Sequence, residues 1–363
     1  MSEYKIDKNI AEFIQKLREK SLKKKKKFSK ESLNKPVSFW IKKERLRNKI
    51  GKEFTIILKT RGCEWALGAE GGCSMCGYIQ DSNIENVKPE QIINQFDYAL
   101  KNKIEEIDND NNDYILKIFN SGSFLDDKEI TENVRNYIYE HINKINKIKE
   151  LVVESRIEYI SKENLLKMKQ LKKKHVEIGI GLETVNDYFR THYINKGLTF
   201  NDFLETVNLC KSQGIGVKAY LLFKPPFMNE IGAIDDCTHS IKTLINLNIN
   251  TISINPLNIQ KGSLAEFLWY QNRYRPPWFY SLFACLKKAI KQEDLTSVRV
   301  LSDPSGAGTK RGIHNCLKRE CNELMINTLR KFVLNQDLSE LNKIDEMMEC
   351  NCKVIYQLQK ELC

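Results

Sequence analysis

Between residues 54 and 258 the sequence alternates between short runs of apolar and β-branched residues and longer amphipathic stretches. Parallel strands need a long crossover, usually a helix, so this alternation predicts parallel strands joined by helices. Six units are too few for a closed eight-fold barrel, and we expect an α/β fold with a partial (β/α)6 barrel, although an open six-stranded sheet of another topology fits as well. The predicted strands are 54–60, 114–120, 150–155, 175–181, 216–223 and 251–258, with a further one at 297–301, and the main predicted helices are 89–101, 130–147, 161–172, 200–213 and 233–247.

The remainder of the 363-residue chain forms two predicted extensions around this core. We expect a basic N-terminal helical extension over residues 1–52, the barrel core over 53–260 and a small cysteine-rich C-terminal extension over 261–363. Within the first of these, the pattern predicts a helix followed by a loop that ends at Pro36. A chain of this length can bury a sizeable core.

The positive charge is concentrated in the N-terminal extension. Residues 1–52 contain 18 Lys/Arg and 6 Asp/Glu, a net charge of +12, whereas the other 40 Lys/Arg and 41 Asp/Glu leave a net charge of −1. Such a one-sided basic segment favours contact with a polyanion, most often RNA. A solvated lysine-rich tail explains the same composition. No apolar run reaches membrane-spanning length and the N-terminus lacks a secretory signal, so we expect a cytoplasmic protein with no membrane contact.

Three cysteines, Cys63, Cys73 and Cys76, lie in a glycine-rich loop directly after the first predicted strand. Loops at the C-terminal ends of barrel strands line the active site. Three thiolates can ligate three irons of a [4Fe–4S] cluster and leave the fourth iron open to chelate S-adenosylmethionine (SAM). Zinc completed by a distant ligand is the alternative, but the position of the loop favours the cluster.

Polar residues at the ends of the next three strands are candidates to bind SAM. Backbone carbonyls at the end of the second strand would contact the SAM amino group. The carboxylate and guanidinium that end the third strand could pair with the SAM ammonium and carboxylate, or only with each other. A carboxylate after two glycines ends the fourth strand, where it faces the adenosyl group or merely begins a helix. These residues are Ser121, Gly122 and Ser123; Glu154 and Arg156; and Glu183.

A second cysteine group lies in the C-terminal extension, where Cys316 and Cys321 precede Cys350 and Cys352. Two close pairs separated by a helical segment are typical of a structural zinc site, in which His314 could replace one thiolate. A second iron–sulfur cluster and unligated thiols are the alternatives. Disulfides are not expected, because the chain has an odd number of cysteines, 11, and an expected reducing compartment.

Seven short segments together resemble the radical SAM subunit of archaeosine synthase. The resemblance covers roughly residues 36–355, and the basic stretch before Pro36 lies outside it. No single segment is specific, but the set is. The segments are 60–63, 71–78, 120–124, 154–156, 181–184, 274–278 and 302–306.

This resemblance implies an archaeal radical SAM enzyme that modifies tRNA at position 15. It implies that a partner enzyme first attaches lysine, through its side-chain amine, to a 7-cyano-7-deazaguanine base. The radical subunit would then cleave a C–N bond in that adduct and leave the formamidine of archaeosine. The resemblance also implies a complex with the lysine-transferring partner, and the reaction requires an external electron donor.

Two other functions remain open from the sequence. One is a different radical SAM reaction on RNA, such as methylthiolation or acetyl transfer, although no extra cluster cysteines precede Cys63 and no acetyltransferase-sized domain is evident. The other is a non-catalytic adaptor that binds zinc and RNA and retains the barrel. Zinc without iron or sulfide would identify the adaptor.

Overall fold

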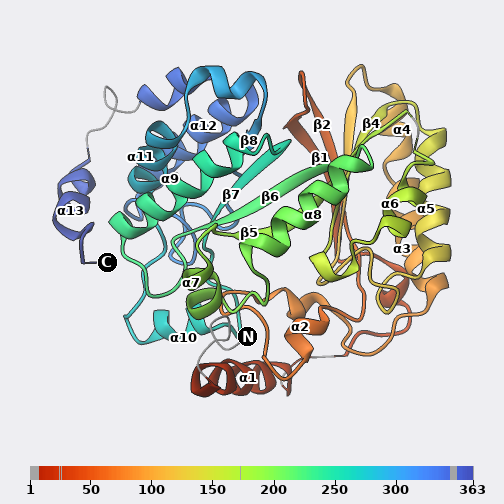
Figure 1. Cartoon of the computed structure of the whole chain (residues 1–363), viewed down its shortest axis with the longest axis horizontal. Coiled ribbons are helices and arrows are strands. Elements are labelled where there is room, and N and C mark those ends of the chain that lie inside the picture. The colour runs from red at the N-terminus through yellow and green to blue at the C-terminus, as the bar shows by residue number, and fades with distance from the viewer. Residues whose placement is uncertain (1–7, 24, 26, 172, 344–349, 363) are drawn as a thin grey trace.

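The computed structural model describes residues 8–343, except 24, 26 and 172, and residues 350–362. The first seven residues of the basic extension and the last residue of the C-terminal extension therefore lie outside the described residues. The described chain forms one curved eight-stranded sheet with helices packed around it (Figure 1). None of the described helices is both long enough and apolar enough to cross a membrane.

The strands follow one another across the sheet in chain order, as expected for a partial barrel. Strands β2 to β8 are parallel, and β1 pairs antiparallel with β2 at one edge. The predicted partial barrel is confirmed, with β8 as a seventh parallel strand. The strands are β1 Ser38–Arg45, β2 Ile50–Ile57, β3 Tyr114–Phe119, β4 Ile148–Glu154, β5 His175–Glu183, β6 Gly216–Phe223, β7 Thr251–Pro256 and β8 Arg299–Leu301.

Strand β1 was not predicted. It lies inside the basic extension, and its sequence SFWIKKER resembles a charged loop more than a strand. Charged side chains, lysine above all, protect an edge strand from pairing with another chain, which explains this composition. The second part of the extension thus belongs to the sheet, and the domain boundaries stay a prediction.

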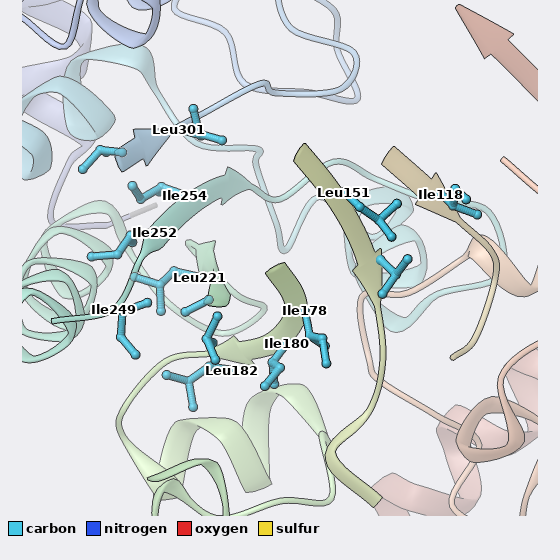
Figure 2. Close-up of a cluster of buried hydrophobic side chains, with 14 of the residues drawn as sticks. Ile118, Leu151, Ile178, Ile180, Leu182, Leu221, Ile249, Ile252, Ile254 and Leu301 are labelled. Atoms are coloured by element: carbon cyan, nitrogen blue, oxygen red, sulfur yellow. The ribbon is translucent and has the colours of Figure 1, made fainter. Parts of the chain in front are cut away.

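Side chains alternate strictly between the two faces of the parallel strands. The convex face is apolar: Ile178, Ile180 and Leu182 of β5 lie beside Leu221 of β6 and Ile252 of β7 in one buried cluster (Figure 2). The concave face is polar. It carries Glu53, Lys117, Glu150, Glu154, Glu177, Lys218, Tyr220, Thr251 and Arg299.

The five predicted helices correspond to α3, α5, α6, α8 and α9, which cover the convex face (Figure 1). Local sequence sets their starts: at α8, Thr199 Oγ1 accepts from Asp202 N at 3.1 Å while Asp202 Oδ2 accepts from Thr199 N at 2.7 Å. The helices are α1 Lys8–Lys23, α2 Glu64–Leu67, α3 Pro89–Lys101, α4 Ile104–Asn109, α5 Glu132–Lys144, α6 Lys162–Met168, α7 Asp187–Phe189, α8 Phe200–Ser212, α9 Glu230–Asn246, α10 Leu264–Tyr270, α11 Phe279–Ala289, α12 Arg319–Asn335 and α13 Cys352–Gln359.

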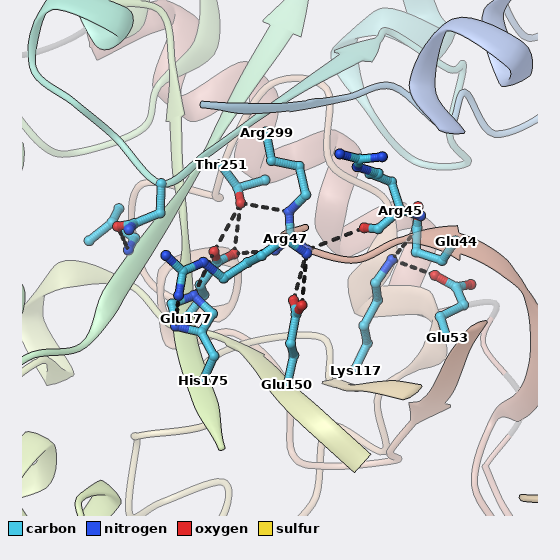
Figure 3. Close-up of polar contacts among 12 residues, drawn as sticks. Glu44, Arg45, Arg47, Glu53, Lys117, Glu150, His175, Glu177, Thr251 and Arg299 are labelled. Atoms are coloured by element: carbon cyan, nitrogen blue, oxygen red, sulfur yellow. Dashed lines mark hydrogen bonds and ion pairs between the residues drawn. The ribbon is translucent and has the colours of Figure 1, made fainter. Parts of the chain in front are cut away.

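Buried ion pairs fill the concave face at the N-terminal ends of the strands (Figure 3). Arg299 bonds Glu150 and Glu177, each at 2.8 Å. Since β8 and β4 are separated by three strands, the Arg299–Glu150 pair can close only across the concave side. We call this group the floor network; its members are Glu44, Glu53, Lys117, Glu150, Glu177 and Arg299.

Lys117 is the second cation of the floor network. It pairs with Glu44 at 2.5 Å and with Glu53. Burial alone would raise the pKa of the Glu44 carboxyl, but the ion pair with Lys117 overrides it and lowers the pKa to about 2. The floor network therefore closes this end of the half-barrel, with each of its two buried cations paired to two carboxylates.

Candidate active site

The three loop cysteines lie together at the opposite end, which we call the mouth: the C-terminal ends of β2–β7 and the loops that follow them. Burial raises the pKa of the Cys63 thiol to about 11, and the neighbouring Cys73 thiol adds to the increase. The same two causes raise the pKa of Cys76. A metal that bound Cys63 and Cys76 would therefore have to displace their protons.

Backbone contacts hold the cysteine loop against the segment that follows β5. Ser74 donates from its N–H to the Ile194 carbonyl at 2.8 Å and from its hydroxyl to the Tyr193 carbonyl at 2.5 Å. Asn195, in the left-handed region with φ of 56°, donates to the Gly72 carbonyl at 2.9 Å. The loop is thus fixed by a segment 120 residues away in the chain, which no local pattern predicts.

Helix α1 covers the cysteine loop from the outside (Figure 1). Ile14 packs in the same apolar cluster as Cys73, and a Cβ at Gly71 would lie 2.6 Å from the backbone N of Gln15. Arg18, which is buried, donates to the Gly71 carbonyl at 3.2 Å and to the Cys73 carbonyl at 3.4 Å. This half of the basic extension is therefore part of the site and is not a free tail.

Cationic side chains surround the three thiols. The charges of Arg18 and Lys196 act on the Cys76 thiol, and that of Arg156 acts on Cys63. Among the described residues, Arg18 Nη1 is buried without a hydrogen-bond partner. An orphaned donor next to the cysteine loop fits a site that takes up an anionic group, because leaving such a donor unsatisfied is costly.

The predicted turn Ser121–Ser123 lies beside the cysteine loop. Ser121 donates to the Tyr78 carbonyl at 2.8 Å, and Arg156 N donates to the Ser123 hydroxyl at 3.0 Å. Behind the turn, the buried Glu129 accepts from Ser123 N at 2.8 Å, and a Cβ at Gly122 would lie 1.7 Å from Glu129 Oε1. Gly122 is required because the Glu129 carboxylate occupies the space of a side chain.

Lys196 contacts both Arg156 and Glu183 and so links them. Arg156 donates to the Lys196 carbonyl at 3.1 Å and packs over the Trp65 ring at 5.0 Å. Lys196 Nζ pairs with Glu183 Oε1 at 2.6 Å. Glu183 has a φ of 69°, a conformation that a side-chain-bearing residue adopts only when its surroundings impose it.

The two glycines before Glu183, Gly179 and Gly181, leave no empty space beside them. A Cβ at Gly179 would lie 2.8 Å from the Tyr220 ring, and one at Gly181 would lie 2.3 Å from Lys196 Nζ. The glycines instead admit Tyr220 and Lys196 to the concave face. Both side chains thereby reach the mouth.

Glu154 is half-buried at the mouth, and in the described chain it forms no ion pair within 4 Å. Burial raises the pKa of its carboxyl, although a hydrogen bond from Tyr220 and the charge of Lys218 oppose that shift. Lys218 lies in turn between mouth and floor, where burial lowers its pKa to about 8. This part of the mouth holds charge that the protein compensates only in part.

The C-terminal cysteines form a compact second group on the far side of α11. The four sulfur atoms of Cys316, Cys321, Cys350 and Cys352 all lie within 4.8 Å of one another. The Cys316–Cys350 and Cys321–Cys352 sulfur separations are 3.8 and 3.7 Å. A tetrahedron with Zn–S bonds of about 2.3 Å has edges of about 3.8 Å, so the arrangement matches one zinc ion.

His314 is not part of this cysteine group. Its Nδ1 bonds the Gly312 carbonyl at 2.7 Å, and burial lowers the pKa of its imidazole to about 4. Around the sulfurs, Tyr280 Oη lies 3.4 Å from Cys352 Sγ, and Trp278 and Tyr356 pack against the group. The four thiols therefore suffice as ligands without histidine.

The sequence was compared with those of known proteins. No family model matches the chain. Archaeosine synthase subunit beta of Methanosarcina acetivorans is 36% identical over 330 residues, which span 91% of each chain. This chain belongs to the archaeosine synthase subunit beta family. The family named from the seven segments, the radical SAM subunit of archaeosine synthase, is therefore confirmed.

Further relatives have the same extent. Archaeosine synthase subunit beta of Thermococcus kodakarensis is 35% identical over 90% of this chain and 98% of its own, and an uncharacterized protein of Methanocaldococcus jannaschii is 41% identical over 98% and 94%. Among solved structures, the archaeal Elp3 of Methanocaldococcus infernus has a TM-score of 0.47 at 15% identity, covering 68% of this chain and 62% of that chain.

In this member of the archaeosine synthase subunit beta family, all six residues proposed for SAM and all three loop cysteines lie at the mouth. Their roles stay predictions. Sequence reasoning missed Arg18, Glu129 and Lys196, which contact them. Glu129 could have been considered from the sequence because it lies only six residues after Ser123. Nothing in the sequence distinguishes Arg18 and Lys196 from other basic residues.

Proposed function

We propose that this chain is the radical SAM subunit that converts the lysine adduct of 7-cyano-7-deazaguanine at tRNA position 15 into archaeosine. One observation carries the proposal: in a member of this family, three buried or partly buried cysteines lie among cations at the mouth of a half-barrel. A zinc- and RNA-binding adaptor would account for the C-terminal cysteine group but not for the three cysteines at the mouth. The named relatives favour archaeosine synthesis over a different radical reaction on RNA.

The residues at the mouth fit the required groups. Cys63, Cys73 and Cys76 would ligate three irons of a [4Fe–4S] cluster, and the unsatisfied Arg18 donor would face the negative charge of the loaded site. When bound, such a cluster supplies the electron that cleaves SAM and yields a 5′-deoxyadenosyl radical. Helix α1 excludes water from the loop by packing over it.

The remaining mouth residues would position SAM. Glu154 would accept from the SAM ammonium together with carbonyls of the Ser121–Ser123 turn, and this would compensate a carboxylate that burial now disfavours. Arg156 would pair with the SAM carboxylate. Glu183, held by Lys196, would face the adenosyl group.

The substrate step follows from the family. Hydrogen would be removed from the lysine-derived carbon next to the nitrogen that the base retains, and the rest of the lysine would leave by fragmentation or oxidation. The name subunit beta of the relatives supports a partner subunit, and the family resemblance implies that this partner transfers lysine to the base. An external reductant would supply the electron, and we expect the protein to work in the cytoplasm.

The decisive experiment is an anaerobic incubation of the reconstituted protein with lysine-adducted tRNA, SAM and reductant, followed by nucleoside mass analysis. We expect archaeosine and 5′-deoxyadenosine in the products. Formation of 5′-deoxyadenosine with a different modified nucleoside would replace the substrate assignment. Protein that contains zinc but neither iron nor sulfide would reject the whole proposal in favour of an adaptor.

We also propose that Cys316, Cys321, Cys350 and Cys352 hold one structural zinc ion. The sulfur separations of 3.7 and 3.8 Å support it, since a four-iron cluster spreads its thiolates farther apart than one ion does. In protein purified without added metal, we expect one zinc per chain, lost in Cys352→Ala while the iron content is unchanged. Loss of iron instead would assign a second cluster to this group.

A further inference from the structure

A groove with a volume of about 1050 Å³ opens at the mouth, beside the cysteine loop. Its walls come from the loops after four strands: Asp187–Ile194 after β5, 224–229 after β6, 269–276 after β7 and 310–317 after β8. Pockets for one small molecule span roughly 300–1,000 Å³, so this groove lies at the upper end of that range. It has room for an extended ligand.

Aromatic rings line the groove and several face solvent. Tyr270 is 66% exposed and Phe227 is 52% exposed. Phe227 has a φ of 68°, and two further residues of the groove, Lys224 and Asn272, are also left-handed. A bulky residue at positive φ is a conformational outlier, so the fold maintains an exposed ring at an energetic cost.

The charge of the groove is one-sided. Four of its 18 described lining residues are Lys or Arg and none is Asp or Glu, and of the four, Lys224 is buried and paired with Glu230 at 2.6 Å. The chain after residue 52 has a net charge of −1, so this is a local exception. Arg273 and Lys310 are exposed, and neither forms an ion pair within the part of the chain that the structure describes. The groove therefore complements an anionic ligand.

The groove is also directly connected to the cysteine loop. Tyr193, whose ring lies 5.8 Å from that of Phe227, accepts through its carbonyl from the Ser74 hydroxyl. On the other wall, Trp269 packs in the same cluster as Cys73. Two wall residues of the groove, Tyr193 and Trp269, thus contact or pack with the cysteine loop.

We propose that this groove, with Phe227 and Tyr270 as stacking rings and Arg273 and Lys310 as phosphate contacts, binds a single-stranded segment of RNA. Exposed rings stack on unpaired bases, and neighbouring cations contact the backbone between them. The inference rests on the proposed function, because it supplies the surface that would deliver an unpaired tRNA base to the mouth. No described residue of the basic extension lines the groove.

The test is anaerobic binding of a labelled tRNA transcript with guanine at position 15 to the reconstituted full chain, measured by fluorescence anisotropy. Tyr270→Ala is expected to weaken tRNA binding by between about fivefold and 100-fold, while its affinity for a fully paired RNA duplex does not change. Arg273→Ala is expected to reduce the slope of log K against log salt by about 0.7. Leu166→Ala and Lys144→Ala, exposed residues on α6 and α5, are the matched controls and should bind as the original chain does.

Iron content and the thermal unfolding midpoint establish that each variant is folded and loaded. If the groove variants bind tRNA as tightly as the controls, or lose duplex binding equally, the groove is not a single-strand site. If the original chain converts lysine-adducted tRNA while the groove variants bind normally, only this inference fails. If the original chain neither binds nor converts that tRNA, the proposed function itself fails.

Discussion

Glu150 and Glu154 lie four residues apart on β4, one at the floor and one at the mouth, and their surroundings differ sharply. Glu150 pairs with Arg299 at 2.8 Å. Glu154 forms no ion pair within the described residues, and burial raises the pKa of its carboxyl. The floor carboxylates are compensated by the protein itself. At the mouth, by contrast, the charge of Glu154 has no ion-pair partner among the described residues, which is the arrangement expected where a charged ligand binds.

This difference separates stability from function along the same strands. Breaking a buried pair leaves an uncompensated charge in the core, which is strongly destabilising. Removing a group that binds a ligand should change the free energy of unfolding little and should weaken ligand binding strongly. Paired substitutions at the floor and the mouth test this separation.

The largest expected effect is complete loss of chemistry at the mouth without loss of fold. Cys76→Ala should have no bound [4Fe–4S] cluster and no SAM cleavage, with a free energy of unfolding close to that of the original chain. The control is Cys210→Ala, a core cysteine, which should lower stability but keep its iron. An intact cluster in Cys76→Ala would remove this residue from the ligand set.

At the floor, Arg299→Met should lower the free energy of unfolding by about 3–5 kcal/mol, because Glu150 and Glu177 remain buried without a partner. Urea unfolding measures the change. At the mouth, Arg156→Met should lose about 1 kcal/mol or less, since its partner Glu158 is half-exposed. Equal losses at the two positions would erase the distinction between floor and mouth.

Lowering the pH should change the contributions of the floor and of the mouth to the free energy of unfolding in opposite directions. Burial alone would raise the pKa of Glu177, but Arg299 lowers it to about 2. Its stabilising contribution, on the order of 3 kcal/mol, is therefore complete above about pH 4.5 and disappears as the pH falls towards 2. Glu154, with a raised pKa, gains stability as it is protonated. Urea unfolding between pH 6 and 3.5 should show a shallower loss in Glu177→Gln and a steeper one in Glu154→Gln.

The smallest effect concerns SAM affinity. Glu154→Gln should raise the Kd for SAM about tenfold, equivalent to about 1.4 kcal/mol, by weakening a charge-assisted hydrogen bond. Equilibrium dialysis with the cluster-loaded protein measures it. Glu163→Gln on α6 is the control, and its Kd should be unchanged. If Glu154→Gln binds SAM with an unchanged Kd, Glu154 does not contribute to SAM binding.

Local pattern was sufficient for most of the fold. The parallel strands and their helices follow from alternating run lengths, because side-chain periodicity is a property of each segment alone. Strand β1 escaped detection because an edge strand can be highly charged. The seventh parallel strand, β8, lies within the further strand predicted at 297–301, although in the structure it comprises only Arg299–Leu301.

The sequence by itself determined the fold class, the family and the two cysteine groups, since clustered thiols are visible as spacing. Only the tertiary structure decided what surrounds them. Arg18 and Lys196 are 178 residues apart and both act on Cys76, and the rings and cations of the groove come from four separate loops. A spacing rule describes one segment, whereas a site at the end of a parallel sheet is assembled from the ends of all its strands.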